Sequence, residues 1–380
     1  MKPLKPDMTA PLTLYGVKIS MFTGKVRSYL IKQSIPFTEV APTTEHFSKI
    51  VLPQIGRRII PVIEMNDGTL VQDTTDIIDY LELQGLATQS AYPAAPLTHL
   101  LSLILELFGD EGLLRPAMHY RWNFPQDTDG FITHGFGGWQ GPDAPDDAKA
   151  QIKKTMGKFS GFLPALGVTP DTIPEVERSF GELLDILEAH FIRTPYLFGD
   201  TPTIGDYGMM CSLYAHLGRD PVPASLMKNR APSLFRWTER MNAPHADYSD
   251  MPYYSPSAAL PETLGPLFKY IADYFLPELR MNVDVMNALP SGESGTPATI
   301  NPKMAVLGFG GFTHGETTIQ CAVRPIRFYM LQRVTDYFSA MEKGDQKAAL
   351  NYLKPMGLSP LVTLTAKHRV DRENHCEVWG

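Results

Sequence analysis

Residues 12–83 alternate between short apolar runs and helix-like apolar stripes. The apolar run from Leu12 to Tyr15 ends at Gly16, and a stripe at helical spacing begins near Thr23. The pattern predicts strand, helix, strand, helix, strand, strand and helix, at residues 12–17, 23–33, 35–40, 44–51, 59–64, 70–72 and from 73 onward. Asn-Asp-Gly at 66–68 is a suitable hairpin turn between the fifth and sixth elements. A small α/β unit is therefore expected first.

Pro61 lies within one of these predicted strands. Proline has no N–H group to donate to a neighbouring strand, so it is found at strand starts and edges. The sequence therefore predicts a strand start or edge at Pro61, with a cis peptide bond as one way to accommodate the ring.

From about residue 93 the pattern changes to long helices. They are predicted at 96–114, 117–122, 148–163, 173–191, 204–217 and 231–241, with Pro116 kinking or ending the first and a loop-rich stretch at 123–146. Thr203 and Asp206 form an acidic capping box, a structural motif that contains Gly205 where helix propensity is poor.

The last third of the chain has its own pattern. A linker at 251–261 precedes a mostly helical stretch at 261–289, a flexible turn region at 291–301, a hairpin at 304–323 and an amphipathic helix at 325–342. The domains expected are 10–88, 93–245 and a C-terminal extension, 255–380, to which the sequence assigns no role.

Composition excludes several classes of protein. Of 380 residues, 43% are apolar, and the net charge of −7 gives no global attraction to nucleic acid or anionic membrane. No apolar run approaches the ~20 residues that a membrane span needs, and the first residues lack the apolar core of a signal peptide. Three widely spaced cysteines predict neither a disulfide framework nor a metal site, and the scattered histidines have no clear metal partner. We expect a cytoplasmic protein.

Ser20-Met21-Phe22-Thr23 stands where the first apolar run gives way to the first helix. Two hydroxyl residues three positions apart correspond to a Cys-x-x-Cys redox pair with oxygen in place of sulfur. A hydroxyl cannot form a mixed disulfide, which argues against disulfide exchange at this position.

Four segments, in order, resemble the glutathione transferase superfamily. They are YGVKISMFTGKVR at 15–27, RIIPVIE at 58–64, VQDTTDIIDYLE at 71–82 and GDTPTIGDYGMM at 199–210. The resemblance covers roughly 10–245 and implies a thioredoxin-like domain followed by an all-α domain. Met21, where the family often has proline, and Gly205, where it often has alanine, depart from the pattern. The resemblance implies no property of residues 255–380.

The resemblance implies glutathione as cosubstrate and Ser20 as the catalytic hydroxyl. A free thiol has a pKa of ~8.5, so little thiolate exists at neutral pH. A hydroxyl that donates a hydrogen bond to sulfur favours the thiolate, as does the positive end of a helix dipole. The alternative is that Ser20 only caps the helix; we expect Thr23 to be the cap.

The family also implies how the tripeptide would be held. The main chain at Ile60, before the cis-proline Pro61, would pair with the cysteinyl unit. Asp73 would meet the γ-glutamyl ammonium, while the Thr74 hydroxyl and helix N–H groups would meet its carboxylate. Both residues are also consistent with simple helix capping. The glycyl carboxylate would be neutralised by loop arginines, Arg57 and Arg58, for which surface exposure is the plain alternative.

A hydrophobic electrophile would bind against the long helices of the second domain. Candidate pocket residues are Tyr15, Phe22, Arg115, His119, Tyr120 and Trp122, with Arg121 also in this stretch. Tyr15 is in addition a second choice for the catalytic hydroxyl, although an apolar strand favours a core tyrosine. The residues near 119 fit equally well a helix end that packs on the loop after it.

The leading hypothesis is a cytoplasmic detoxification enzyme that adds glutathione to an electrophile. Two other hypotheses stay open: a binding or scaffold protein on the same fold without turnover, and a lyase or isomerase with glutathione as cofactor. The family implies a homodimer, unless the extension covers or replaces that interface.

Overall fold

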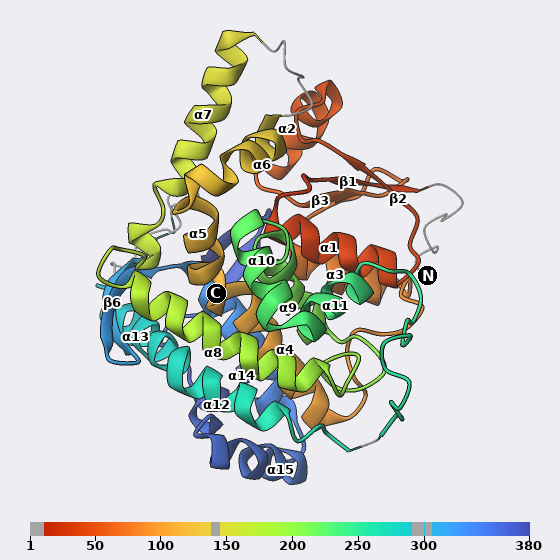
Figure 1. The fold of residues 1–380 in the computed structure, drawn as a ribbon, viewed down its shortest axis with the longest axis vertical. Helices are drawn as coiled ribbons and strands as arrows, with labels where there is room; N and C mark the ends of the chain where they lie inside the picture. The colour runs from red at the N-terminus through yellow and green to blue at the C-terminus, as the bar shows by residue number, and fades with distance from the viewer. Residues whose placement is uncertain (1–10, 138–144, 258, 291–299, 301–305) are drawn as a thin grey trace.

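The N-terminal region folds around a four-stranded mixed sheet (Figure 1). The computed structural model describes residues 11–137, 145–257, 259–290, 300 and 306–380. The strand order is β2-β1-β3-β4, with β1 parallel to β2 and antiparallel to β3. The elements are β1 Leu12–Tyr15, α1 Met21–Lys32, β2 Phe37–Val40, a π-helical turn Phe47–Val51, α2 Leu52–Ile55, β3 Val62–Glu64, β4 Leu70–Gln72 and α3 Thr74–Leu83.

This order confirms the predicted α/β unit, and β4 has the predicted bounds. The Ile60–Pro61 bond is cis, and Pro61 directly precedes β3, as its missing N–H predicted. The first helix begins two residues earlier than expected, at Met21 rather than Thr23. Thr23 is therefore not the cap: the helix is capped by Ser20, whose hydroxyl accepts a hydrogen bond from the Thr23 backbone N–H.

A helical body follows the sheet. Its elements are α4 Pro96–Leu107, a π-helical turn Phe108–Gly112, α5 Leu114–Trp122, α6 Pro125–Gly137, α7 Asp146–Ser160, α8 Ile173–Phe191, α9 Ile204–Ala215, α10 Pro221–Arg230 and α11 Pro232–Met241. The break near Pro116 has another cause than expected. The first helix gives way to the π-helical turn, and Pro116 lies in the first turn of α5, where its missing N–H costs little.

Two predictions in this body were wrong. The stretch expected to be loop contains α6, whose glycines and proline hid its helical pattern; residues 138–144 of that stretch lie outside the described residues. Helix α10 was not predicted, because three of its residues from Pro221 are proline or alanine and its apolar stripe is weak. Together α6 and α7 form a projection from the body (Figure 1).

The predicted capping box at the start of α9 is formed. Asp206 is fully buried and accepts hydrogen bonds from the backbone N–H groups of Leu197 and Thr203, at 3.0 and 2.9 Å, and from the Trp237 indole at 3.1 Å. Gly205 lies where α9 crosses α4: an added Cβ would stand 3.0 Å from the Leu105 Cβ. Close helix packing therefore explains the glycine.

The C-terminal extension packs on the rest of the protein. Its elements are α12 Leu264–Tyr274, α13 Leu276–Asn287, β5 Gly308–His314, β6 Thr317–Val323, α14 Pro325–Ala340, α15 Lys343–Leu353, β7 Val370–Glu373 and β8 Cys376–Trp379. This confirms the hairpin and amphipathic helix predicted at 304–323 and 325–342. Helix α15 and the hairpin β7–β8 were not predicted, and most of the turn region 291–301 lies outside the described residues.

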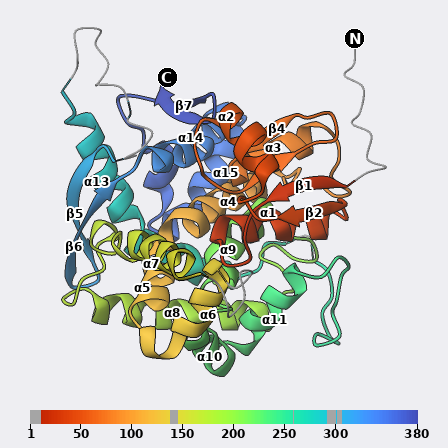
Figure 2. The same cartoon turned by 90° about the horizontal axis from the view of Figure 1, so that it is seen from above.

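One hydrophobic cluster joins all three parts: it contains Leu14 of β1, Ile104 of α4 and Phe328 of α14. Figure 2 shows β7 beside α2, and both α14 and α15 pack on α4. The extension is thus continuous with the core in its packing. Within the described part of the chain, none of the helices has the length and apolar character needed to cross a membrane.

The capping box gives a stability prediction. Asp206→Ala leaves three buried N–H donors without an acceptor, so we expect it to lower the free energy of unfolding by about 3–5 kcal/mol. Thr203→Ala removes a cap hydroxyl and should cost only about 1 kcal/mol. Chemical denaturation measures both, with Asp200→Ala, an exposed carboxylate in the same segment, as the control expected within 0.5 kcal/mol of wild type. Equal losses at 203 and 206 would contradict this ranking.

Candidate active site

Strands β1 and β4 end, and strand β3 begins, at the same end of the sheet. Tyr15 of β1 pairs with Val62 of β3, and Val62 pairs with Gln72 of β4. The loop after β1, the cis-proline before β3 and the start of α3 after β4 therefore meet at this end. In this way the fold gathers predicted site residues from three separate segments.

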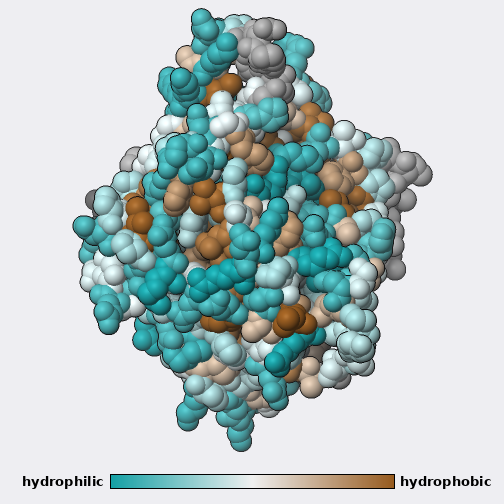
Figure 3. Space-filling model, viewed as in Figure 1, coloured by the Kyte–Doolittle hydropathy of each residue, from teal (hydrophilic) through white to brown (hydrophobic). Residues whose placement is uncertain are grey.

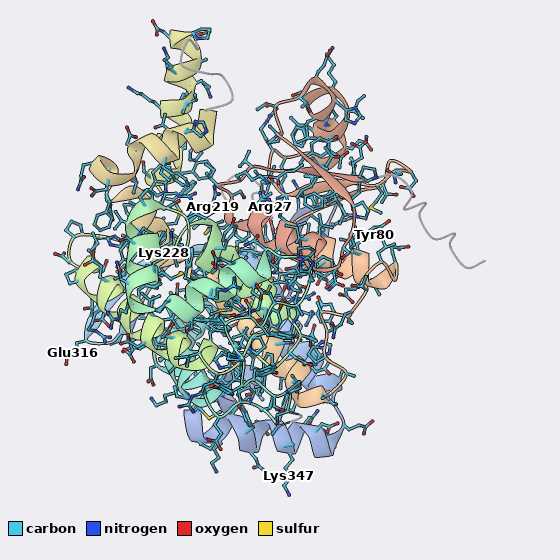
Figure 4. All side chains as sticks on the ribbon, turned by 45° about the vertical axis from the view of Figure 1, so that its right-hand side comes forward. Arg27, Tyr80, Arg219, Lys228, Glu316 and Lys347 are labelled. Atoms are coloured by element: carbon cyan, nitrogen blue, oxygen red, sulfur yellow. The ribbon has the colours of Figure 1, made fainter. Side chains whose placement is uncertain are left out.

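Arginines from three elements hold the loop at 16–20, between β1 and α1. Arg27 of α1 donates to the Val17 carbonyl at 3.3 Å, and Arg121 of α5 donates to the Ile19 carbonyl at 2.7 Å. Arg219, which follows α9, donates to the Lys18 carbonyl between them. Figure 4 labels Arg27 and Arg219, which lie on the side where the sheet meets the helical body. Three consecutive carbonyls are thus fixed.

Each arginine is itself positioned. Arg121 is buried and forms a two-pronged ion pair with Asp220, at 2.6 and 2.7 Å. Arg27 pairs in the same way with Glu39 of β2. The guanidinium of Arg219 lies over the Phe131 ring of α6 at 5.5 Å. Because these contacts come from four elements, the loop backbone is held rigidly.

Ser20 ends this loop and is half-buried. Its hydroxyl oxygen accepts from the Thr23 N–H at 3.2 Å, which leaves the hydroxyl proton free to donate. The first turn of α1 contains no acidic side chain, so the positive end of the helix dipole is not neutralised there. Thr23 is fully buried and packs on Gly16, where an added Cβ would stand 2.2 Å from the Thr23 methyl group. Only glycine allows this close approach.

Asp73 and Pro61 are joined directly, because the Asp73 N–H donates to the Pro61 carbonyl at 3.2 Å. Asp73 has a positive φ of 80°, a conformation that costs a residue with a side chain about 1–3 kcal/mol and is often found at functional sites. The buried Thr74 hydroxyl donates to Asp73 at 3.4 Å. Ile60 is half-buried beside them in sequence. Four of the predicted glutathione-binding residues thus lie at one place.

The extension reaches this place too. Arg372 of β7 pairs with Asp73 at 2.9 Å, and Glu377 of β8 pairs with Arg57 at 3.0 Å. Burial alone would raise the pKa of Asp73, but the Arg372 charge and hydrogen bond hold that pKa below its ordinary value. Arg58 points elsewhere: it donates to the Pro42 carbonyl and lies over the Phe47 ring.

Four predicted pocket residues are engaged in packing away from the loop. The Tyr15 hydroxyl donates to Glu64 at 2.6 Å within a separate apolar cluster. Arg115 pairs with Glu278 of the extension at 3.0 Å. The His119 ring bonds to Glu177 at 2.9 Å, and Tyr120 stacks on Phe124. The contacts of His119 and Tyr120 agree with the alternative of helix-end packing, and those of Tyr15 agree with the alternative of a core tyrosine.

Arg115 also borders a small cavity. Its volume is about 20 Å³, room for about one water molecule, and its lining comes from α5, α8, α12, β5, the turn before α5 and Phe275 between α12 and α13. No residue of the loop at 16–20 contributes to it. This cavity is too small and too distant in the fold to hold the electrophile.

Trp122 is the pocket candidate that remains open. It is half-buried, its indole N–H has no hydrogen-bond partner among the described residues, and its ring lies 5.9 Å from Phe136. Phe136 in turn contacts Phe159 of α7. Helix α6 reaches the loop at 16–20, because Gly135 of α6 packs on Ile19 of that loop. Phe22, also half-buried, packs against the main core instead.

The sequence missed helix α6, which carries one of these aromatic residues, Phe136. We call Trp122, Phe136 and Phe159 the aromatic cluster. Figure 3 shows that apolar residues on this side of the molecule form small separate patches and that the projection around α7 is mainly hydrophilic. Small separate apolar patches are more typical of a binding site for a small apolar ligand than of a broad protein interface.

A thioredoxin-like sheet with a cis-proline at the start of β3, followed by a helical body, defines the class of fold. Comparison with known families is consistent with this. Residues 14–85 match the family model described as glutathione S-transferase, N-terminal domain, and residues 170–240 match glutathione S-transferase, C-terminal domain. These two matches identify residues 14–85 and 170–240 as glutathione S-transferase N-terminal and C-terminal domains, while the extension lies outside both matches.

Solved structures of glutathione S-transferases are similar to this chain at low identity. One from Rhodospirillum rubrum F11 is 17% identical over 66% of this chain and 96% of its own, with a TM-score of 0.38. One from Ceriporiopsis subvermispora, in complex with glutathione, is 16% identical over 61% and 96%, with a TM-score of 0.42. The β-etherase LigF from Sphingobium sp. strain SYK-6 is 16% identical over 62% and 96%, with a TM-score of 0.41.

Because these TM-scores are below 0.5, the family assignment rests on the two domain models. No curated protein matches the chain at a significant level.

Sequence signals exist for some of the residues that build the site and not for others. Arg27 lies in the Lys-Val-Arg segment of the resemblance, and Arg121 lies in the stretch proposed for the pocket, where it positions the loop instead. Arg219 had no signal. Neither did Arg372 and Glu377, because they belong to the extension that no motif covers.

The buried ion pair of Arg121 and Asp220, next to the loop at 16–20, gives the next prediction. Arg121→Gln leaves Asp220 buried without its partner, so we expect the free energy of unfolding to fall by about 3–5 kcal/mol. Arg219→Gln removes a less buried contact to the same loop and should cost less than 1 kcal/mol. Denaturation gives the energies, and amide hydrogen exchange at residues 17–20 should accelerate most in Arg121→Gln. Unchanged exchange in that variant would contradict the positioning role.

Proposed function

We propose that this protein is a glutathione transferase that holds the glutathione thiol as a thiolate at Ser20. The observation that carries this proposal is the register Tyr15–Val62–Gln72, which brings the loop that ends at Ser20, cis Pro61 and Asp73 to the same end of the sheet. The proposed domains are the glutathione-binding domain 10–88, the helical domain 93–245 and the extension 255–380.

The chemistry required of the site is ionisation of a thiol. A thiol of pKa ~8.5 is mostly protonated at pH 7. Lowering that pKa by one unit takes about 1.4 kcal/mol of preference for the thiolate. A hydrogen bond donated by Ser20 and the unneutralised N-terminus of α1 are each of this order. The thiolate then attacks the electrophile, the leaving group departs or the added carbon takes a proton, and the nucleophile stays on the cosubstrate.

Glutathione would lie along this end of the sheet. Its cysteinyl unit would pair with the main chain at Ile60, its γ-glutamyl ammonium with Asp73 and its γ-glutamyl carboxylate with Thr74 and the N-terminus of α3. Arg57 is the better partner for the glycyl carboxylate, because Arg58 is turned toward Pro42. The electrophile would then lie between the loop at 16–20 and the aromatic cluster.

A detoxifying role, a cytoplasmic location and a homodimer belong to this proposal as the family implies them. The extension bears on the last of these: α14 packs on α4, and α15 packs there as well. The faces of α3 and α4 covered by the extension are therefore closed to a second subunit. A dimer would have to form through another surface.

A scaffold without turnover is the second candidate. One observation favours it: Asp73 and Arg57 already hold charged partners from the same chain. The two candidates differ in whether glutathione binds and is turned over.

Turnover tests the catalytic assignment. Ser20→Ala removes the donor to the thiolate, so we expect turnover of glutathione with an aryl halide to fall roughly tenfold, the equivalent of one pKa unit, while glutathione affinity changes little. Thr23→Val, which removes a buried hydroxyl three residues away, should leave turnover nearly unchanged. Ser20→Ala also loses a helix cap worth about 1 kcal/mol, so thermal denaturation must show that the variant is folded. Full activity in folded Ser20→Ala would overturn the role of Ser20.

Binding tests the glutathione site independently of turnover. Thr74→Val removes the hydroxyl that would meet the γ-glutamyl carboxylate without changing the shape of the side chain. We expect glutathione affinity, measured by calorimetry, to fall about ten- to a hundredfold, as one hydrogen bond to a charged group implies. Thr74→Ser keeps the hydroxyl and should bind like wild type. Equal affinity in all three proteins would place the carboxylate elsewhere.

A further inference from the structure

The hairpin β7–β8 presents two opposite charges on one face. Its strands pair in register, with Arg372 opposite Glu377, and the turn is made by Asn374 and His375, both with positive φ. Residues directly opposite in an antiparallel pair point to the same side. Glu373 and Cys376, the next pair, therefore point to the other side.

These two charges contact residues proposed to bind glutathione. Arg372 pairs with Asp73 at 2.9 Å and with Asp76 at 2.7 Å, while Glu377 pairs with Arg57 at 3.0 Å. The side chains of Arg372 and Glu377 are each only 7% exposed. The hairpin therefore presents a cation to the carboxylate expected to bind an ammonium, and a carboxylate to the arginine expected to bind a carboxylate.

The hairpin is anchored at its root on α14. The Gln332 side chain makes two hydrogen bonds to the Val370 backbone, at 2.7 and 2.9 Å, and the Arg372 guanidinium lies over the Tyr329 ring at 4.6 Å. The hydroxyl of Tyr329 donates to Asp76 of α3. The anchor on α14 therefore keeps the hairpin beside α3, whether or not the tip of the hairpin is in contact with Asp73 and Arg57.

Beyond the root, the hairpin is held by charge more than by apolar burial. Of the ten residues 370–379, Val370 is the only apolar residue that is buried. A two-stranded hairpin has little stability of its own, and segments with few buried apolar contacts open at low free-energy cost. The tip can therefore separate from α3 without unfolding the core.

We propose that β7–β8 is an internal ligand of the glutathione site: Arg372 and Glu377 occupy Asp73 and Arg57, and glutathione binds by displacing the hairpin. This inference rests on the proposed function, because it takes glutathione as the competing ligand. When the competent state is a fraction of the population, the apparent dissociation constant is the intrinsic one divided by that fraction. Weakening the hairpin contact therefore raises glutathione affinity.

The test uses the full chain and two matched double variants. R372Q/E377Q removes both charges that face the glutathione site. R369Q/E373Q makes the same two chemical changes at Arg369, just before the hairpin, and at Glu373 within it, and neither of these residues faces the glutathione site. Arg369 pairs with Asp336 at the surface, with both side chains about half exposed, and Glu373 is exposed. Calorimetry with glutathione should show about tenfold or greater tightening in R372Q/E377Q and no change in R369Q/E373Q.

The outcomes separate this inference from the proposed function. If wild type and R372Q/E377Q bind glutathione equally well, the internal-ligand role is wrong and the glutathione site stands. Equal tightening in both variants assigns the effect to charge in general and also overturns the inference. If neither wild type nor R372Q/E377Q binds glutathione, the proposed function fails and the inference fails with it.

A second measurement needs no variant. Amide hydrogen exchange over residues 370–379 of the wild-type protein should accelerate when glutathione saturates it, because bound glutathione holds the hairpin away from α3. Exchange at β5–β6, a hairpin remote from Asp73 in the chain and bonded to no site residue, should not change. Unchanged exchange at 370–379 with glutathione bound would contradict displacement, even if R372Q/E377Q failed to fold.

Discussion

The position of Ser20 depends on three guanidinium groups that bind three consecutive backbone carbonyls. Arg27, Arg219 and Arg121 come from α1, from the segment after α9 and from α5, and they meet at Val17, Lys18 and Ile19. A loop held from the sheet side and from the helical side cannot shift without breaking charge-assisted hydrogen bonds. The two domains thus fix the catalytic candidate together, and neither would do so alone.

Charged side chains also organise the contacts along α3. Asp73, Asp76 and Asp79 lie at intervals of three residues and form one acidic stripe. The extension meets this stripe with Arg372, Tyr329 and Arg333. The stripe that begins at the proposed glutathione site is therefore also the surface on which the extension is docked. Binding at one end of it is coupled physically to the hairpin.

Much of the fold could be predicted from the sequence because its signals are local. The α/β pattern, the cis-proline position and the Thr-x-x-Asp box each depend on residues close in the chain, and all three were found. Helix α6 was missed because its glycines obscured the apolar stripe. Thr23 was taken for the cap because the first helical turn at Met21 carries no polar signal that separates N-cap from N3.

The site was less predictable, since side-chain partners come from distant segments. Ser20, Pro61 and Asp73 were proposed through resemblance, and strand register explains why the three segments that carry them meet. His119 and Tyr120 looked chemically rich, yet burial commits them to packing. Arg372 lies almost 300 residues from Asp73 in the chain, and no periodicity or motif relates them. Contacts of this kind follow only from the assembled structure.

A crystal structure of the protein grown with glutathione tests the central claim most directly. We expect the glutathione sulfur within hydrogen-bonding distance of the Ser20 hydroxyl, the cysteinyl unit paired with the main chain at Ile60, and Arg372 no longer in contact with Asp73. A structure in which glutathione lies elsewhere, with the hairpin still on Asp73 and Arg57, would contradict the claim.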